Sequence, residues 1–251
     1  MADLKWYADH APEGTTVMDL TSAWTTLGIW GPRSRDIVQA ASHDDVSTEA
    51  IRFRTARTIG IGPAQVLAQR ITYVGELGFE LYAEPGDAVQ VWDRLAAAGR
   101  AHDLRIAGYR CLDGLRMEKG YRYMGTDLTA GDTPYEAGLV FCVAMDKGDF
   151  TGREALAAAS ESKRRLRTLL VGGEEYRCLY GGEAVHAEGE VVSRVRSCAY
   201  GFTVGGNIAY AYLPASAGTG DAYEVEVLGE LVPARVAEAV LYDPSHERVR
   251  S

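Results

Sequence analysis

The 251-residue sequence is poor in the residues that build metal and disulfide sites. It contains four cysteines and five histidines. No two cysteines form a CxxC pair, and no histidine stands near a cysteine at zinc-finger spacing. We therefore expect no metal site, and we interpret the cysteines as buried or incidental thiols of a protein in a reducing compartment.

Long hydrophobic runs and a basic surplus are also lacking. No segment approaches the roughly 20 apolar residues of a membrane span, and the first residues, MADLKWYADHAPEG, hold no apolar run of signal length. Lys and Arg number 26 against 35 Asp and Glu, for a net charge of −9. Because binding to nucleic acid needs a dominant basic face, we expect a cytoplasmic protein with no nucleic-acid partner and no membrane partner.

Several catalytic signatures are missing as well. No spacing suggests a Ser-His-Asp or Cys-His arrangement, and the sequence has neither a GxGxxG fingerprint nor a P-loop. The residues alone therefore leave the catalytic groups unknown.

What is present divides the chain in two. Alternating apolar residues predict strands over residues 50–61 and 66–73, and apolar residues spaced by three and four predict helices over 85–95 and 110–119. This order predicts an α+β fold with ferredoxin-like layers. Beyond a linker at residues 160–165, short β-prone runs between glycine turns predict a small β-barrel. We predict domains at residues 1–160 and 165–251.

The most informative short run is RITYVGELGFELY, residues 70–82. Its alternation and its two glycines predict two strand arms around a turn, with Glu80 and Tyr82 on one face. One arm then carries the ring of Tyr73 and the other the carboxylate of Glu80. Such a pair suits a flat heterocycle with an amidine-like edge, because a carboxylate accepts two parallel N–H donors. A surface hairpin with a solvated Glu80 is the other interpretation.

The predicted helix over residues 110–119 carries several charges on nearby turns. Arg110, Asp113 and Arg116 could form a solvated ladder along the helix surface. Alternatively, one of the two arginines points into a cleft and holds a carboxylate. The pattern alone leaves both interpretations open.

Six runs together resemble one known family. They are LGIWGPRSRDIV, RITYVGELGFELY, AGYRCLDGLRMEKGYRYMGTDLT, TPYEAGLVF, DKGDFTGREAL and NIAYAYLP. The sequence resembles the aminomethyltransferase, or glycine-cleavage T-protein, superfamily over roughly residues 4–250. It looks most like the branch that is fused to dimethylglycine and sarcosine dehydrogenases.

The resemblance implies a protein that binds tetrahydrofolate and moves a one-carbon unit. On matching positions, Tyr73 and Glu80 correspond to the family's pterin-contacting residues. Arg110 is the candidate for the helix arginine near the folate tail, as in the dehydrogenase-fused branch. The aminomethyltransferase proper carries that arginine where this chain has Leu112, and Arg116 is interpreted as structural.

Two departures from the family pattern shape further expectations. The first residues match a point well inside the family sequence, so we expect a second chain to supply the N-terminal half in a heterodimer, or else a homo-oligomer. Asp3, Asp9 and Asp19 lie after the position of the usual catalytic acid, which leaves that group unassigned. In the C-terminal domain, residues bulkier than the family's usual Gly, Thr and Gly suggest a reshaped pocket mouth or turn; they are Ser193, Arg196 and Cys198.

The functional expectation is a subunit of a tetrahydrofolate-dependent methyl- or aminomethyl-transferase or demethylase. It would act on a small methylated substrate and be inactive without its partner chain. The alternative is a folate-binding, regulatory or scaffold protein without turnover. A third interpretation is a structural subunit of a larger oxidase with a degenerate pocket.

Overall fold

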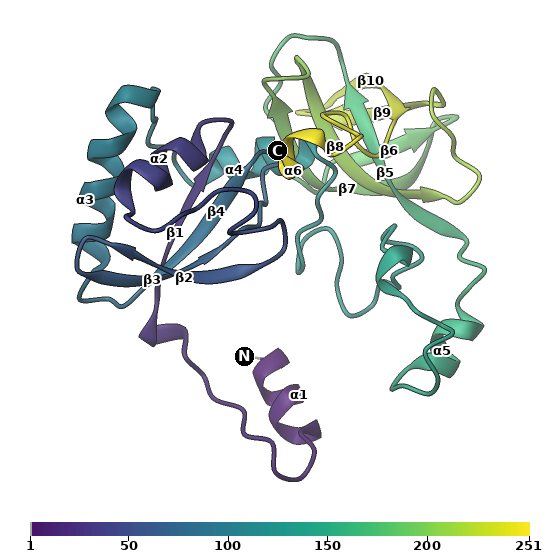
Figure 1. The fold of residues 1–251 in the computed structure, drawn as a ribbon. Helices are drawn as coiled ribbons and strands as arrows, with labels where there is room; N and C mark the ends of the chain where they lie inside the picture. The colour runs from purple at the N-terminus through teal and green to yellow at the C-terminus, as the bar shows by residue number, and fades with distance from the viewer. Residues whose placement is uncertain (1) are drawn as a thin grey trace. The chain divides into compact units, whose positions relative to one another are not determined.

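The computed structural model describes residues 2–251, which fall into two units (Figure 1). The first unit comprises the residues up to Thr72 together with Glu76–Ile106 and Glu247–Ser251. The second comprises Tyr73–Gly75 and Ala107–His246. The predicted linker at 160–165 falls inside the second unit and runs into the first barrel strand, which begins at Arg164.

The first unit is an antiparallel sheet with helices. Its strands are β1 (Thr25–Trp30), β2 (Ala56–Ile61), β3 (Ala64–Gln69) and β4 (Gly78–Ala83), in the order β1-β4-β3-β2. Its helices are α1 (Ala2–His10), α2 (Ser34–Ala41), α3 (Ala88–Gly99) and α6 (Glu247–Arg250), with 3-10 turns at Thr21–Ala23 and Arg100–His102.

One face of this sheet packs against α2 and α3 in a single apolar core. Ile37 and Val38 of α2 and Val91 of α3 are almost fully buried there, together with strand residues such as Phe79 and Leu81. Along β4, Phe79, Leu81 and Ala83 are buried while Glu80 and Tyr82 are only partly so. This period of two directs Glu80 and Tyr82 to the opposite face of the sheet.

Trp30 lies over two glycines on that opposite face. A Cβ atom on Gly28 would stand 2.2 Å from an atom of the indole ring, and a Cβ atom on Gly78 would stand 2.1 Å from another. Gly28 pairs with Glu80 across the β1–β4 ladder, and Trp30 pairs with Gly78. Glycine is therefore required at both positions, since only a missing side chain lets the indole lie flat beside Glu80.

The second unit is built on a closed barrel. Its strands are β5 (Arg164–Val171), β6 (Ala184–Ala187), β7 (Glu190–Gly201), β8 (Gly206–Pro214), β9 (Ala222–Val227) and β10 (Glu230–Ala237), and they close in the order β10-β5-β8-β7-β6-β9. Closure leaves no unpaired strand edge in this unit. Before the barrel come α4 (Arg110–Glu118), a 3-10 turn at Val140–Cys142 and α5 (Arg153–Ala158).

The helix α4 is fixed to the barrel by buried polar contacts. The Tyr210 hydroxyl donates to the carbonyl of Met117 at 2.9 Å. Glu118 accepts from the backbone of Thr203 at 2.6 Å, and Lys119 pairs with Asp243 at 2.7 Å. Each partner lies far along the chain, so tertiary contacts as well as local preference hold the end of α4 in place.

The fold-class prediction is confirmed: an α+β sheet precedes a closed barrel. Two details differ from the expectation. The strand expected over 50–61 begins only at Ala56, where β2 starts. The strand expected over 66–73 ends at Gln69, so Tyr73 lies in the loop before β4 and not on a strand arm.

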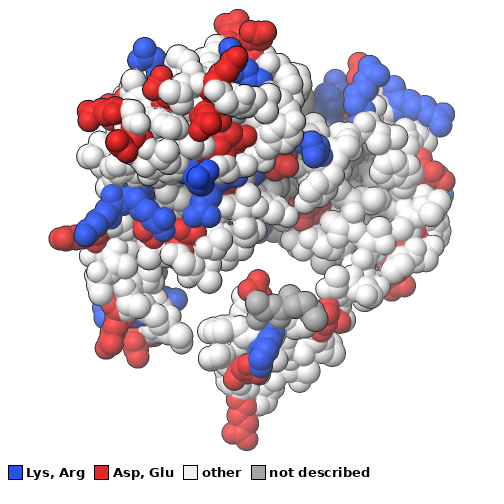
Figure 2. Space-filling view, turned by 180° about the vertical axis from the view of Figure 1, so that it is seen from behind, with Lys and Arg blue, Asp and Glu red and all other residues white. Residues whose placement is uncertain are grey.

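Surface charge is mixed on the face drawn in Figure 2, where groups of both signs lie close together. Across residues 2–251, none of the helices has the length and apolar composition needed to cross a membrane. The same residues contain no cluster of three or more His, Cys, Asp or Glu side chains placed to hold a metal ion.

Candidate functional site

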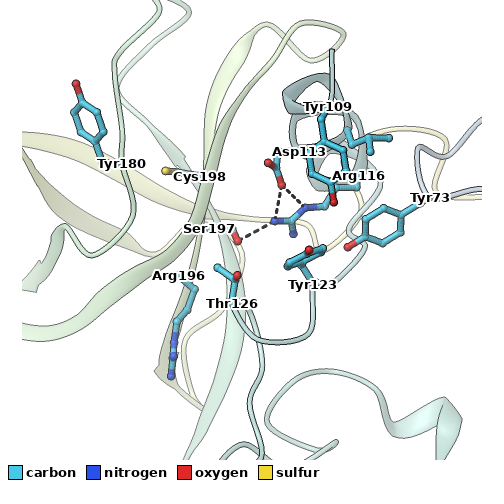
Figure 3. A pocket seen from close by; sticks show the side chains of 11 residues that line it. Tyr73, Tyr109, Asp113, Arg116, Tyr123, Thr126, Tyr180, Arg196, Ser197 and Cys198 are labelled. Atoms are coloured by element: carbon cyan, nitrogen blue, oxygen red, sulfur yellow. Dashed lines mark hydrogen bonds and ion pairs between the residues drawn. The ribbon is translucent and has the colours of Figure 1, made fainter. Parts of the chain in front are cut away.

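A cavity of about 250 Å³ lies within the second unit, between α4, the loop that follows it and β7 (Figure 3). Its walls combine aromatic rings, charged groups and one apolar side chain. They are Tyr73, Tyr109, Leu112, Asp113, Arg116, Tyr123, Thr126, Tyr180, Arg196, Ser197 and Cys198. Ring faces beside a few polar groups are typical of ligand pockets.

Arg116 is the buried centre of one wall. Its Nη1 donates to the carboxylate of Asp127 and to the carbonyl of Tyr121. Its Nη2 donates to Ser197 at 2.8 Å and to Asp113 at 3.2 Å, and its Nε donates to Asp113 at 3.3 Å. A guanidinium has five N–H groups, and these contacts use all five, so Arg116 has none left for a ligand.

Tyrosine rings form the neighbouring wall. The ring of Tyr73 lies nearly parallel to that of Tyr121, with centroids 6.0 Å apart, and is tilted by 46° to that of Tyr123 at 6.5 Å. The Tyr73 hydroxyl donates to the carbonyl of Arg122 at 2.8 Å. Burial raises the pKa of Tyr73 to about 12. Tyr73 is therefore a fixed, neutral ring that presents an aromatic surface to the cavity.

The strand β7 supplies the third wall through Arg196, Ser197 and Cys198. The Arg196 guanidinium stands 5.2 Å from the ring centroid of Tyr212 and 3.7 Å from Asp132. Burial raises the pKa of the Cys198 thiol to about 12, so this thiol is a poor nucleophile at neutral pH. Of the four free cysteines, Cys111 and Cys142 are exposed, and Cys178 and Cys198 are partly buried.

Of the three site residues predicted from the sequence, Tyr73 lines the cavity. Arg110 is the first residue of α4, but its side chain is exposed and lies outside the lining. Glu80 belongs to the first unit. There its carboxylate accepts from the Tyr82 hydroxyl at 2.7 Å, which confirms that the two side chains share a face.

Sequence reasoning missed two candidate site residues. Trp30 places its ring beside Glu80, and the two glycines beneath the ring were the available signal. Tyr123 lines the cavity from an irregular loop, where no periodicity marks it. Its ring stands 5.8 Å from the Arg116 guanidinium.

We expect the second unit to lose stability at high pH. Burial raises the pKa values of Tyr73 and Tyr212 to about 12, above the value of about 10 in an unfolded chain. The unfolded state therefore releases these protons first, so this contribution is full below about pH 10 and is lost between about pH 10 and 12. Urea midpoints at pH 9 and 11 measure it. Between pH 9 and pH 11, the urea midpoint of Tyr73→Phe should fall less than that of the wild type. Equal decreases in the two proteins would contradict the assignment to Tyr73.

Fold and cavity together define a class: an α+β sheet unit and a closed-barrel unit, with a cavity lined by tyrosines and arginines in the barrel unit. Two family models match the sequence of the chain. Residues 1–147 match the GCVT N-terminal domain, and residues 164–243 match the glycine cleavage T-protein C-terminal barrel domain. The chain therefore belongs to the glycine cleavage T-protein family, as the sequence motifs indicated.

Similar proteins agree with this membership. The chain is 39% identical to 4-methylaminobutanoate oxidase (formaldehyde-forming) of Paenarthrobacter nicotinovorans, over 95% of this chain and 29% of the relative. It is 37% identical to mitochondrial sarcosine dehydrogenase of Mus musculus, over 93% of this chain and 26% of the relative. It is 34% identical to an aminomethyltransferase of Saccharopolyspora erythraea, over 89% of this chain and 61% of the relative.

A solved structure shares the fold. The glycine cleavage system aminomethyltransferase T from Bartonella henselae superposes with a TM-score of 0.81 at 23% identity, over 96% of this chain and 66% of that one. The chain spans between about a quarter and three fifths of the length of the three relatives named above.

Proposed function

We propose that this chain binds tetrahydrofolate and takes part in the transfer of a one-carbon unit, methyl or aminomethyl, from a small methylated substrate. The observation that carries the proposal is the cavity of the second unit, where tyrosine rings and two arginines line one space. Family membership and the names of the relatives, an aminomethyltransferase among them, support the same chemistry.

The cavity residues fit parts of a folate. Tyrosine faces suit a planar heterocycle or a benzoyl ring, and a guanidinium suits the carboxylates of a glutamyl tail. At about 250 Å³ the cavity lies just below the usual 300–1,000 Å³ of drug-sized sites, so it would hold one portion of the molecule. Tetrahydrofolate, when bound, supplies the nitrogen atoms that accept the one-carbon unit.

Each predicted site residue has a role in this proposal. The Tyr73 ring contacts the pterin, and the Glu80 carboxylate accepts hydrogen bonds from the pterin N–H and amino groups. Trp30, whose ring lies beside Glu80, would orient the same heterocycle. Arg110, exposed at the start of α4, is the candidate for an outer carboxylate of the folate tail. The catalytic acid or base stays unassigned.

Truncating Tyr73 is expected to weaken tetrahydrofolate binding by about 2- to 10-fold, the range for a lost aromatic contact. Tyr73→Phe keeps the ring and should bind nearly as the wild type does. Anaerobic calorimetric titration of the wild type, Tyr73→Ala and Tyr73→Phe tests this. Absence of tetrahydrofolate binding to the wild type would overturn the proposed function.

We also propose that a second chain joins this one to make the active enzyme, as a heterodimer or else as a homo-oligomer. Strand β1 has a single partner in the sheet, β4. Close before it in the sequence, Met18, Leu20 and Trp24 are 68%, 50% and 39% exposed. An open edge near exposed apolar side chains favours association. Size-exclusion chromatography with light scattering tests it, and a stable monomer at micromolar concentration would count against it.

Two outcomes separate an enzyme from a folate-binding protein without turnover. Methyl transfer to tetrahydrofolate without release of formaldehyde, with or without a co-expressed partner, supports the enzyme. Tight binding of tetrahydrofolate with no transfer in either case supports the alternative. A cytoplasmic location stays a prediction.

A further inference from the structure

The two arginines that line the cavity differ in what they can offer a ligand. All five N–H groups of Arg116 donate to protein oxygens. By contrast, among residues 2–251 the Arg196 guanidinium donates no hydrogen bond. Its nearest carboxylate, Asp132, stands 3.7 Å away, beyond hydrogen-bond distance. Arg196 therefore keeps its planar set of donors available.

Asp132 is also engaged elsewhere. Its Oδ1 accepts from Arg164 at 2.9 Å, and its Oδ2 accepts from the backbone and hydroxyl groups of Thr129. Arg164 also binds Glu136 at 2.8 Å. Asp132 is thus a shared and already satisfied partner, which leaves Arg196 weakly paired although its side chain is only 35% exposed.

The ring of Tyr212 holds Arg196 in position without using its donors. The guanidinium carbon lies 5.2 Å from the ring centroid, within the range of a cation–π contact. Figure 3 shows the Arg196 side chain at the edge of the cavity, running away from Arg116. An arginine that is oriented by stacking and poor in hydrogen bonds is prepared for the bidentate contact that carboxylates make with guanidinium groups.

We propose that Arg196 is the carboxylate-binding residue of this cavity and anchors a ligand that carries a carboxylate beside its ring system. That the ring system of the ligand is a pterin rests on the proposed function. The anchor itself, Arg196 of β7, stands where the family usually has a smaller residue. Leu112 offers no charge in the same cavity, and Arg110 lies outside its lining.

The test compares two ligands that differ in the carboxylate-bearing tail: tetrahydrofolate, and tetrahydropterin, which lacks the tail. Arg196→Met is expected to weaken tetrahydrofolate binding roughly 10- to 100-fold, because a charge-assisted contact is lost. Tetrahydropterin binding should stay within about twofold of the wild type. Anaerobic calorimetric titration of both ligands measures both quantities.

Arg194→Met is the matched control. Arg194 lies two residues earlier on β7, is exposed and bonds to the carbonyl of Gly182, so the same loss of charge there should leave both affinities unchanged. Equal tetrahydrofolate affinity in the wild type and Arg196→Met would overturn the assignment, as would an equal loss for both ligands. If the wild type binds neither ligand, the proposed function fails with it.

Discussion

Replacing Arg116 by Met is expected to lower the free energy of unfolding of the second unit by about 3–5 kcal/mol, the cost of breaking a buried ion pair on one side. The Arg116 and Asp127 side chains are 2% and 0% exposed. Without the guanidinium, the Asp127 carboxylate would stay buried with the backbone N–H of Tyr123 as its remaining donor. Its Oδ1 already has no hydrogen-bond partner.

Urea unfolding followed by circular dichroism measures this change. The four tryptophans, Trp6, Trp24, Trp30 and Trp92, all lie in the first unit, so their fluorescence reports that unit separately. Arg110→Met on the same helix removes an exposed charge and should change stability by about 0.5 kcal/mol or less. The double variant Arg116→Met, Asp127→Leu should recover part of the loss, because no charge is then left unpaired. A loss below 1 kcal/mol in the single variant would contradict this account.

The predictions that succeeded rest on local geometry. Alternation along residues 79–82 placed Glu80 and Tyr82 on one face, and their 2.7 Å hydrogen bond confirms it. Helical spacing likewise placed a helix over Arg110–Glu118. A period of two or of 3.6 residues is set by the backbone itself, so a short stretch of sequence contains enough information.

The parts that failed depend on residues far apart in the chain. Tyr73 continues the alternating pattern, yet it leaves the sheet, and its hydroxyl binds the carbonyl of Arg122, 49 residues away. The charges of α4 suggested either a solvated ladder or a ligand clamp. The structure instead shows Arg116 bound to Asp127 and Ser197, which are 11 and 81 residues away. No spacing rule contains such partners.

Arg196 illustrates a third situation. Its departure from the family pattern marked the run as altered, but the sequence could not show what the side chain does. Its availability follows from two facts of packing: Tyr212 stacks on the guanidinium, and Arg164 takes up Asp132. Both depend on strand pairing in the barrel, where β5 and β7 lie on either side of β8.

Replacing Glu80 by Ala is expected to weaken tetrahydrofolate binding by about 1.5–3 kcal/mol, which is roughly 10- to 150-fold in the dissociation constant. The carboxylate lies on the sheet face opposite the helices, beside the ring of Trp30. The Tyr82 hydroxyl orients it through one oxygen. That leaves acceptor capacity for the N–H and amino donors of a pterin, and a charged acceptor makes such contacts strong.

Three further variants separate the charge of Glu80 from its position. Glu80→Gln keeps an acceptor but loses the charge, so its affinity should fall between those of the wild type and Glu80→Ala. Tyr82→Phe leaves the carboxylate and removes its 2.7 Å donor, so a smaller loss is expected from poorer orientation alone. Glu84→Ala, an exposed carboxylate just beyond β4, should bind as the wild type does. Because the role proposed for Glu80 is to bind the pterin, Glu80→Ala should weaken tetrahydropterin and tetrahydrofolate alike. An affinity within twofold of the wild type for both ligands would remove Glu80 from the site.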